Sequence, residues 1–86
     1  MKYLIFPTLD LANAWSANFG ARYTQIQGVT PAPGFRYSDA MPLIDGRYAV
    51  LIVDWAAQYL TPDEAAQLVD IAPDQFVPSP GPGNGS

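Results

Sequence analysis

Acidic side chains are the residues of this chain whose types and spacing could do chemistry. Asp45, Asp54, Asp63 and Glu64 lie close together in the sequence. Paired carboxylates can act as general acid and base, or can hold Ca²⁺ or Mg²⁺. The chain contains no histidine and no cysteine, so the usual neutral-pH base and the thiolate metal ligands are missing. Any reactive centre would therefore depend on these carboxylates.

Local roles in the backbone account for most of the acids. The Asp45–Gly46 pair is typical of a type I′ hairpin turn, in which both central residues need positive φ. Residues 61–64 read TPDE, in which a threonine caps a helix, a proline fits its first position and a glutamate completes a capping box. Asp10 has a matching place near the start of an earlier helix. These acids are expected to bend the backbone or to start helices.

Asp39 and Asp54 are the acids without such a role. A tight hairpin about residues 45–46 would bring them near each other, but two residues out of direct register. Serine nucleophiles such as Ser16 and Ser38 would lack their usual base. We therefore expect no catalytic residue, no metal site and no cofactor.

Length and composition predict one small globular domain. The chain has 86 residues, of which 49% are hydrophobic and 14% are charged. Such a chain can bury one thin core, and so few charges leave apolar surface that a partner could cover.

Charge argues against nucleic acid as a partner. The net charge is −4 and the four basic residues, Lys2, Arg22, Arg36 and Arg47, are scattered, whereas nucleic-acid binding needs a concentration of Lys and Arg. An acidic mimic of DNA would need rows of carboxylates, which the sequence does not show. No stretch is long and apolar enough to span a bilayer, and Pro7 and Asp10 interrupt what would be the apolar part of a signal peptide. We expect no membrane association and no small-molecule substrate.

Periodicity predicts the elements of the N-terminal half. Residues 2–6 form a short apolar run bounded by proline, which indicates a buried strand. A helix follows from about Leu9 to Gly28, with an apolar stripe at helical spacing formed by Ala12, Trp15, Phe19 and Tyr23. The Pro- and Gly-rich residues 30–35 then form a connector.

The C-terminal half is expected to contain two strands and a second helix. Residues 36–44 form an extended segment that Pro42 places at a sheet edge, and residues 47–53 form a central strand covered on both faces. A helical turn at 54–60 precedes a helix at 61–72, whose narrow apolar face is Ala65, Leu68, Val69 and Ala72. Together the elements predict an α+β domain over residues 1–77, in the order β-α-β-β-α, with a short sheet packed against two helices. Residues 78–86 are expected to form an extended or flexible Pro/Gly arm.

Aromatic side chains and the arm are the candidate partner-binding residues. Trp55 and Tyr59 are hard to bury in so thin a domain, and aromatic residues are favoured at protein interfaces, although a core role is an equal alternative. The full set of predicted partner-binding residues is Phe35, Tyr37, Trp55, Tyr59, Phe76, Pro78 and Pro80.

The sequence also resembles a group of small, mostly uncharacterised accessory proteins of tailed bacteriophages and prophages. The similarity rests on the MKYLIF start with its threonine and Ala-rich helix, on GVT at 28–30, on the DGR turn before an apolar strand, and on LTPDEAAQLVD at 60–70 with a late aromatic residue and proline. The Pro-rich connector and the longer tail depart from that pattern.

The resemblance implies a phage-encoded protein from among the tail and fibre genes, and it supplies no catalytic residues. We therefore expect a non-enzymatic structural or tail-associated protein that binds other virion proteins or further copies of itself. Its expected location is the virion, or the host cytoplasm during assembly. The alternative is a small acidic inhibitor that binds a host protein.

Overall fold

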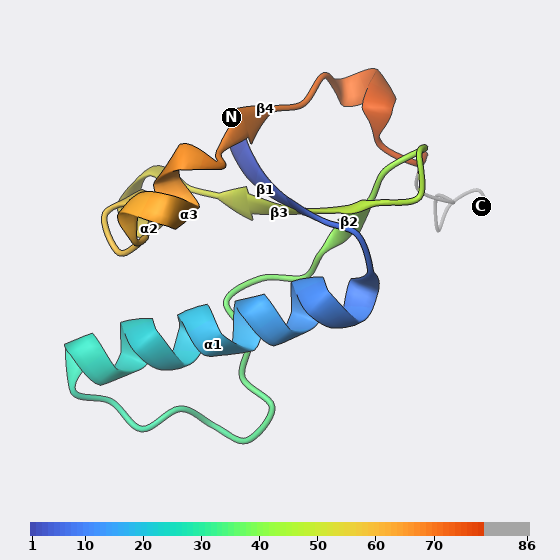
Figure 1. The fold of residues 1–86 in the computed structure, drawn as a ribbon. Helices are drawn as coiled ribbons and strands as arrows, with labels where there is room; N and C mark the ends of the chain where they lie inside the picture. Colours follow the sequence, from blue (N-terminus) through green and yellow to red (C-terminus); the bar gives the residue numbers. More distant parts are fainter. Residues whose placement is uncertain (79–86) are drawn as a thin grey trace.

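The structure is a computed structural model that describes residues 1–78. These residues form an antiparallel sheet of four strands in the order β2-β3-β1-β4, with three α-helices, so the expected α+β class is confirmed. The elements in chain order are β1 (Lys2–Phe6), α1 (Leu9–Gln27), β2 (Met41–Pro42), β3 (Tyr48–Ile52), α2 (Asp54–Ala57), α3 (Pro62–Ala66), β4 (Val69–Asp70) and a 3₁₀ turn (Pro73–Gln75). Figure 1 shows α1 along one face of the sheet and the C-terminal segment crossing the other.

Helix α1 begins and ends where the sequence predicts. The hydroxyl of Thr8 accepts a hydrogen bond from the backbone N–H of Leu11 at 3.2 Å, which satisfies a free donor of the first turn. At the other end Gly28 takes a φ of 75°. The next N–H, of Val29, donates to the carbonyl of Thr24 at 2.8 Å, the pattern of a Schellman motif.

The sheet separates two small hydrophobic clusters because successive strand residues point to opposite faces. The cluster on the helix side contains Leu4, Ala12, Phe19, Val50, Ile52 and Ala56. The cluster on the other face contains Tyr3, Leu43 and Ala49, against which Phe76 and Ile71 also pack. Strand β3 lies between β2 and β1, which confirms the prediction of a central strand covered on both faces.

The predicted helix at 61–72 is wrong in its second half. Its start is confirmed, because Thr61 and Glu64 form a complete capping box, but α3 ends at Ala66. Val69 and Asp70 instead form β4, opposite Tyr3 and Lys2 of β1. A short helix gains little stability by itself, whereas the free edge of β1 offers this segment hydrogen bonds from a distant part of the chain.

The hairpin turn lies where it is predicted, but its type differs. The N–H of Gly46 donates to the carbonyl of Leu43 at 3.0 Å, which makes Ile44 and Asp45 the central residues of the turn. Gly46 follows them with a φ of 92°, as in a three-residue hairpin with a bulge. Only Met41–Pro42 of the predicted strand at 36–44 is extended and paired with β3.

The segment between α1 and β2, residues 28–40, is longer than the connector predicted at 30–35, and we call this whole segment the connector. Contacts of the buried Ser16 fix it against α1. The hydroxyl of Ser16 donates to the carbonyl of Ser38 at 2.7 Å and accepts from its N–H at 2.8 Å. The N–H of Tyr37 donates to the carbonyl of Ser16 at 3.1 Å. Ser16 is fully buried, so this hydroxyl has a structural role and sets the position of Tyr37. Within residues 1–78, no helix is both long and apolar enough to cross a membrane.

Candidate protein-interaction surface

Aromatic rings from three segments of the chain, namely α1, the connector and α2, contact one another on the helix side of the sheet. Trp15 stacks on Phe19 with ring centroids 4.9 Å apart. Phe19 contacts Tyr37 edge-on at 4.9 Å, and Tyr37 in turn lies 5.9 Å from Trp55. Such edge-on and stacked pairs stabilise the arrangement beyond the area that they bury. The rings therefore connect the interior of the domain to its surface.

Trp55 lies at the exposed end of this group. Its side chain remains 48% exposed, although Tyr23 supports its ring at 5.0 Å. Tyr23 also contacts Tyr59 at 5.4 Å. We call Tyr23, Trp55 and Tyr59 the Trp55 surface. It is a rigid aromatic patch, because its rings are held by helix α1 on one side and by α2 and the following turn on the other.

The side chain of Tyr37 is more buried than that of Trp55. Its hydroxyl donates to the carbonyl of Leu51 at 2.9 Å and accepts from the N–H of Val53 at 3.1 Å. These bonds fasten the connector to the end of β3, just before α2. The half-buried ring therefore positions Trp55, and a direct contact with a partner stays a prediction for Tyr37.

Phe35 packs over a glycine of α1. It is 40% exposed, and a Cβ built on Gly20 would lie 2.7 Å from its ring and 3.2 Å from the backbone nitrogen of Tyr37. Only glycine allows the connector to approach the helix so closely. Phe35 thus lies beside the aromatic group without belonging to the Trp55 surface.

The other predicted contact residues lie elsewhere. Phe76 is half-buried in the second cluster, with its ring 5.3 Å from that of Tyr3. Pro78 is exposed, while Pro80 and most of the predicted arm lie outside the described residues. The structure therefore brings Tyr37, Trp55 and Tyr59 together and separates them from the C-terminal group.

A partly buried hydrogen-bond network centred on Glu64 contacts the aromatic group through Trp15. Glu64 accepts from Arg22 through two bonds of 2.8 and 3.1 Å, and from the indole Nε1 of Trp15 at 2.8 Å. It also accepts from the N–H of Thr61 at 2.8 Å. The bonds from Arg22 are the main reason that the pKa of Glu64 falls to about 2, with smaller contributions from Thr61 and Trp15 and an opposing effect of desolvation. Sequence analysis assigned Glu64 only to the cap, because no local pattern reveals a partner in another helix.

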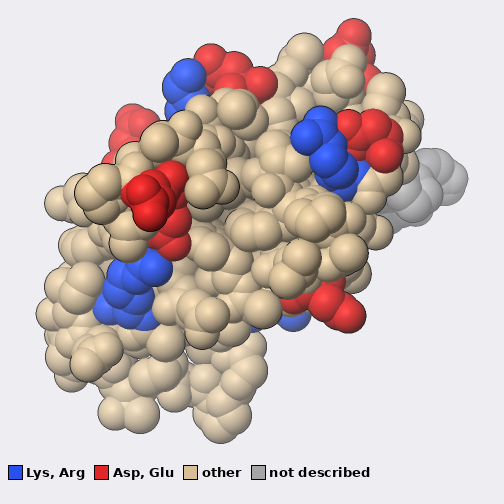
Figure 2. All heavy atoms as spheres, viewed as in Figure 1, with Lys and Arg blue, Asp and Glu red and all other residues tan. Residues whose placement is uncertain are grey.

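Every positive side chain of the protein is paired with a carboxylate. The pairs are Lys2–Asp70, Arg22–Glu64, Arg36–Asp39 and Arg47–Asp45. The four other acids each lie in the first turn of a helix, namely Asp10, Asp54, Asp63 and Asp74, where the helix dipole favours negative charge. Figure 2 shows charges in small groups between wide uncharged areas on the face it draws. The expected local roles of the acids are thus largely confirmed.

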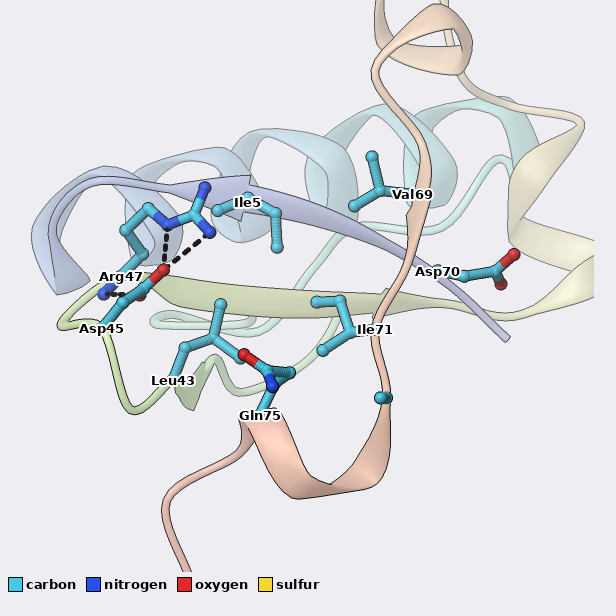
Figure 3. Close-up of a pocket in the computed structure, with 9 residues that line it drawn as sticks. Ile5, Leu43, Asp45, Arg47, Val69, Asp70, Ile71 and Gln75 are labelled. Atoms are coloured by element: carbon cyan, nitrogen blue, oxygen red, sulfur yellow. Dashed lines mark hydrogen bonds and ion pairs between the residues drawn. The ribbon is translucent and has the colours of Figure 1, made fainter.

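A hollow of about 320 Å³ lies on the other face of the sheet. Its walls combine aliphatic side chains with polar and charged ones, and the Asp45–Arg47 ion pair lies at one end (Figure 3). Arg47 donates to both oxygens of Asp45, at 2.9 Å from its backbone and 2.8 Å from Nε, and these bonds lower the pKa of that carboxyl. Both oxygens of Asp45 therefore already accept hydrogen bonds, and a carboxyl with a lowered pKa is a weak general base. Within residues 1–78, no three carboxylates are grouped as metal ligands.

Comparisons with known proteins identify no relative. No family model, no curated protein and no solved structure matches this chain.

Proposed function

We propose that this protein is a non-enzymatic structural or tail-associated component of a bacteriophage, and that it binds other proteins of the virion through the Trp55 surface. The observation that carries the binding proposal is Trp55 itself, a large ring that is 48% exposed yet held by Tyr23 and Tyr37. A rigid, exposed tryptophan loses little conformational freedom on binding and is a frequent energetic centre of interfaces. The phage context rests on the sequence resemblance alone.

The charge distribution supports binding to protein and not to nucleic acid. All four cations are already neutralised by acids of the same chain, so contacts with phosphates would first require breaking ion pairs. An acidic inhibitor of a host protein would need carboxylates gathered on one surface. Here the acids outside ion pairs are distributed over the starts of four helices, which favours the structural proposal.

Mass spectrometry of purified particles tests the proposal. Particles from cells that carry this gene should contain the chain at a fixed copy number that survives washing in high salt, because the proposed contact is apolar. A photoreactive residue at position 58, which is exposed and one helical turn after Trp55, where the Gln58 amide donates to the Trp55 carbonyl, should cross-link to one defined virion protein. The same probe at position 10 is the matched control, since Asp10 is exposed on another part of the surface. Absence of the chain from particles would contradict the proposal, and equal cross-linking from both positions would contradict the assignment of the contact to the Trp55 surface.

A further inference from the structure

Residues 71–78, which we call the strap, cross the sheet from one edge to the other. The strap begins after β4, the strand at one edge of the sheet, and passes through the 3₁₀ turn. At the opposite edge the N–H of Ile44 donates to the carbonyl of Gln75 at 2.9 Å, and the N–H of Val77 donates to the carbonyl of Pro42 at 3.0 Å. Leu43 and Phe76 face each other between these two bonds. The C-terminal segment is therefore hydrogen-bonded at both edges of the same sheet (Figure 1).

Most of the strap is exposed. Only Ile71 and Phe76 are half-buried, and both pack against the second cluster, with the Phe76 ring on Tyr3. The hollow of about 320 Å³ lies between the strap and the sheet, with Ile5 and Leu43 on the sheet side and Ile71 and Gln75 on the strap side (Figure 3). Empty space removes packing partners from the atoms that line it. A segment with so few packed contacts opens at a lower free energy than the core strands do.

Opening of the strap would create a site whose shape is known, because the strap itself occupies it. After opening, the carbonyl of Pro42 and the N–H of Ile44 would be free at a sheet edge. Between them would lie the apolar surface that Phe76 covers in the closed form. Exposed edges of this kind bind extended segments by adding a strand. The matching ligand is an extended segment with an aromatic residue flanked by a free carbonyl and a free N–H.

We propose that this edge binds the strap of a second copy of the chain, so that two copies exchange residues 71–78 by domain swapping. A second copy supplies the same residues and can reproduce every contact of the closed form, which makes exchange a low-cost route to association. Within one chain the strap has an effective concentration on the order of millimolar, so exchange requires copies crowded to a similar level, as in an assembly. The inference uses residues apart from the Trp55 surface, and each can fail without the other.

Two single-cysteine variants of the full chain, Ile44→Cys and Gln75→Cys, test the exchange. Both side chains are exposed, and the protein has no other cysteine. Facing residues in a hydrogen-bonded antiparallel pair lie about 5.5 Å apart between Cα atoms, within the range that a disulfide spans. Because each variant has one thiol, a 44–75 disulfide can form only between two chains.

Equal amounts of the two variants are mixed at about 0.01 and about 1 millimolar, below and near the effective concentration of the strap, and are then oxidised. Peptide mapping counts the 44–44, 44–75 and 75–75 disulfides. Random pairing would make the 44–75 link one half of all disulfides. At the higher concentration we expect its fraction to be clearly above one half. Adding Phe76→Ala to the Gln75→Cys chain should remove the excess, while Val77→Ala, the matched control at an exposed neighbour, should preserve it. A 44–75 share at or below one half, or no disulfide at all, at both concentrations would overturn the proposal.

Discussion

Glu64 caps the start of α3 and also binds Arg22, which lies 42 residues earlier in α1. One carboxylate thus completes the local helix cap and also forms a long-range ion pair. The same group accepts from the indole of Trp15, so the network fixes one ring of the aromatic group that leads to Trp55. We therefore expect the stability of the Trp55 surface to depend on a residue that does not belong to it.

Glu64→Gln isolates the long-range part of this role, because glutamine also serves in a capping box. The pair is partly buried, with side-chain exposures of 33% for Arg22 and 18% for Glu64. Loss of the charge should lower the free energy of unfolding by about 1–2 kcal/mol, measured by urea denaturation. The control is Asp45→Asn, at an exposed ion pair, which should leave the denaturation midpoint close to that of the wild type. Equal effects of the two changes would contradict the network.

Acid should weaken the protein in a defined range. The pKa of Glu64 is lowered from 4.5 to about 2, so its contribution is complete above pH 4.5 and is lost as the pH falls through about 2. Thermal unfolding followed between pH 7 and pH 2 should show this decline, and Glu64→Gln should show a shallower one. Some acid dependence should remain in the variant, since ion pairs with Arg47 and Lys2 also lower the pKa values of Asp45 and Asp70. Parallel curves for the two proteins would be inconsistent with this account.

Tyr37→Phe should loosen the connector without changing the fold. The hydroxyl bonds both Leu51 and Val53, and its removal leaves a carbonyl and an N–H without that partner. We expect a loss of about 1–2 kcal/mol in unfolding free energy and faster hydrogen exchange at Val53. Tyr48→Phe is the control, because Tyr48 is half-buried like Tyr37 and its hydroxyl takes part in none of the side-chain hydrogen bonds among residues 1–78. A similar loss in both variants would show that the ring environment, and not the hydrogen bonds, is responsible.

Gly20→Ala tests the close approach of the connector to α1. Alanine in an exposed helix position would stabilise by about 1 kcal/mol relative to glycine. Here its Cβ meets the Phe35 ring at 2.7 Å and the Tyr37 nitrogen at 3.2 Å, so we expect no gain or a net loss in thermal stability. Combining the change with Phe35→Ala should recover part of the loss in a double-mutant cycle. Stabilisation by Gly20→Ala alone would show that the connector does not pack there.

The sequence predicts best the features that depend on neighbouring residues. Thr8 and Gly28 bound α1 as expected, because a cap or a left-handed stop needs only residues within a few positions. The capping box at Thr61 is correct for the same reason. The end of α3 is wrong because the competing partner of Val69 is β1, at the other end of the chain.

The candidate site is predictable only in part for a related reason. Aromatic residue types indicated a contact role for Trp55 and Tyr59, with a core role as an equal alternative; Trp55 is exposed, whereas Tyr59 is half-buried. Spacing could not show that Tyr37 reaches between α1 and α2, since its position depends on the buried contact of Ser16 with Ser38. The sequence places residues up to 77 in the domain but does not predict the pairing of residues 75–77 with residues 42–44, because these hydrogen bonds join residues far apart in the sequence.

The central claim is that Trp55 binds another virion protein, and the most direct measurement compares how variants are incorporated into particles. Quantitative mass spectrometry would count copies of the wild type, of Trp55→Ala and of Leu11→Ala, an exposed apolar control that is 52% accessible. Loss of a central tryptophan contact should cost about 2 kcal/mol or more, and therefore reduce affinity at least tenfold. We expect Trp55→Ala to be depleted from particles by about that factor, while it remains folded by circular dichroism and Leu11→Ala is incorporated normally. Normal incorporation of folded Trp55→Ala would contradict the account.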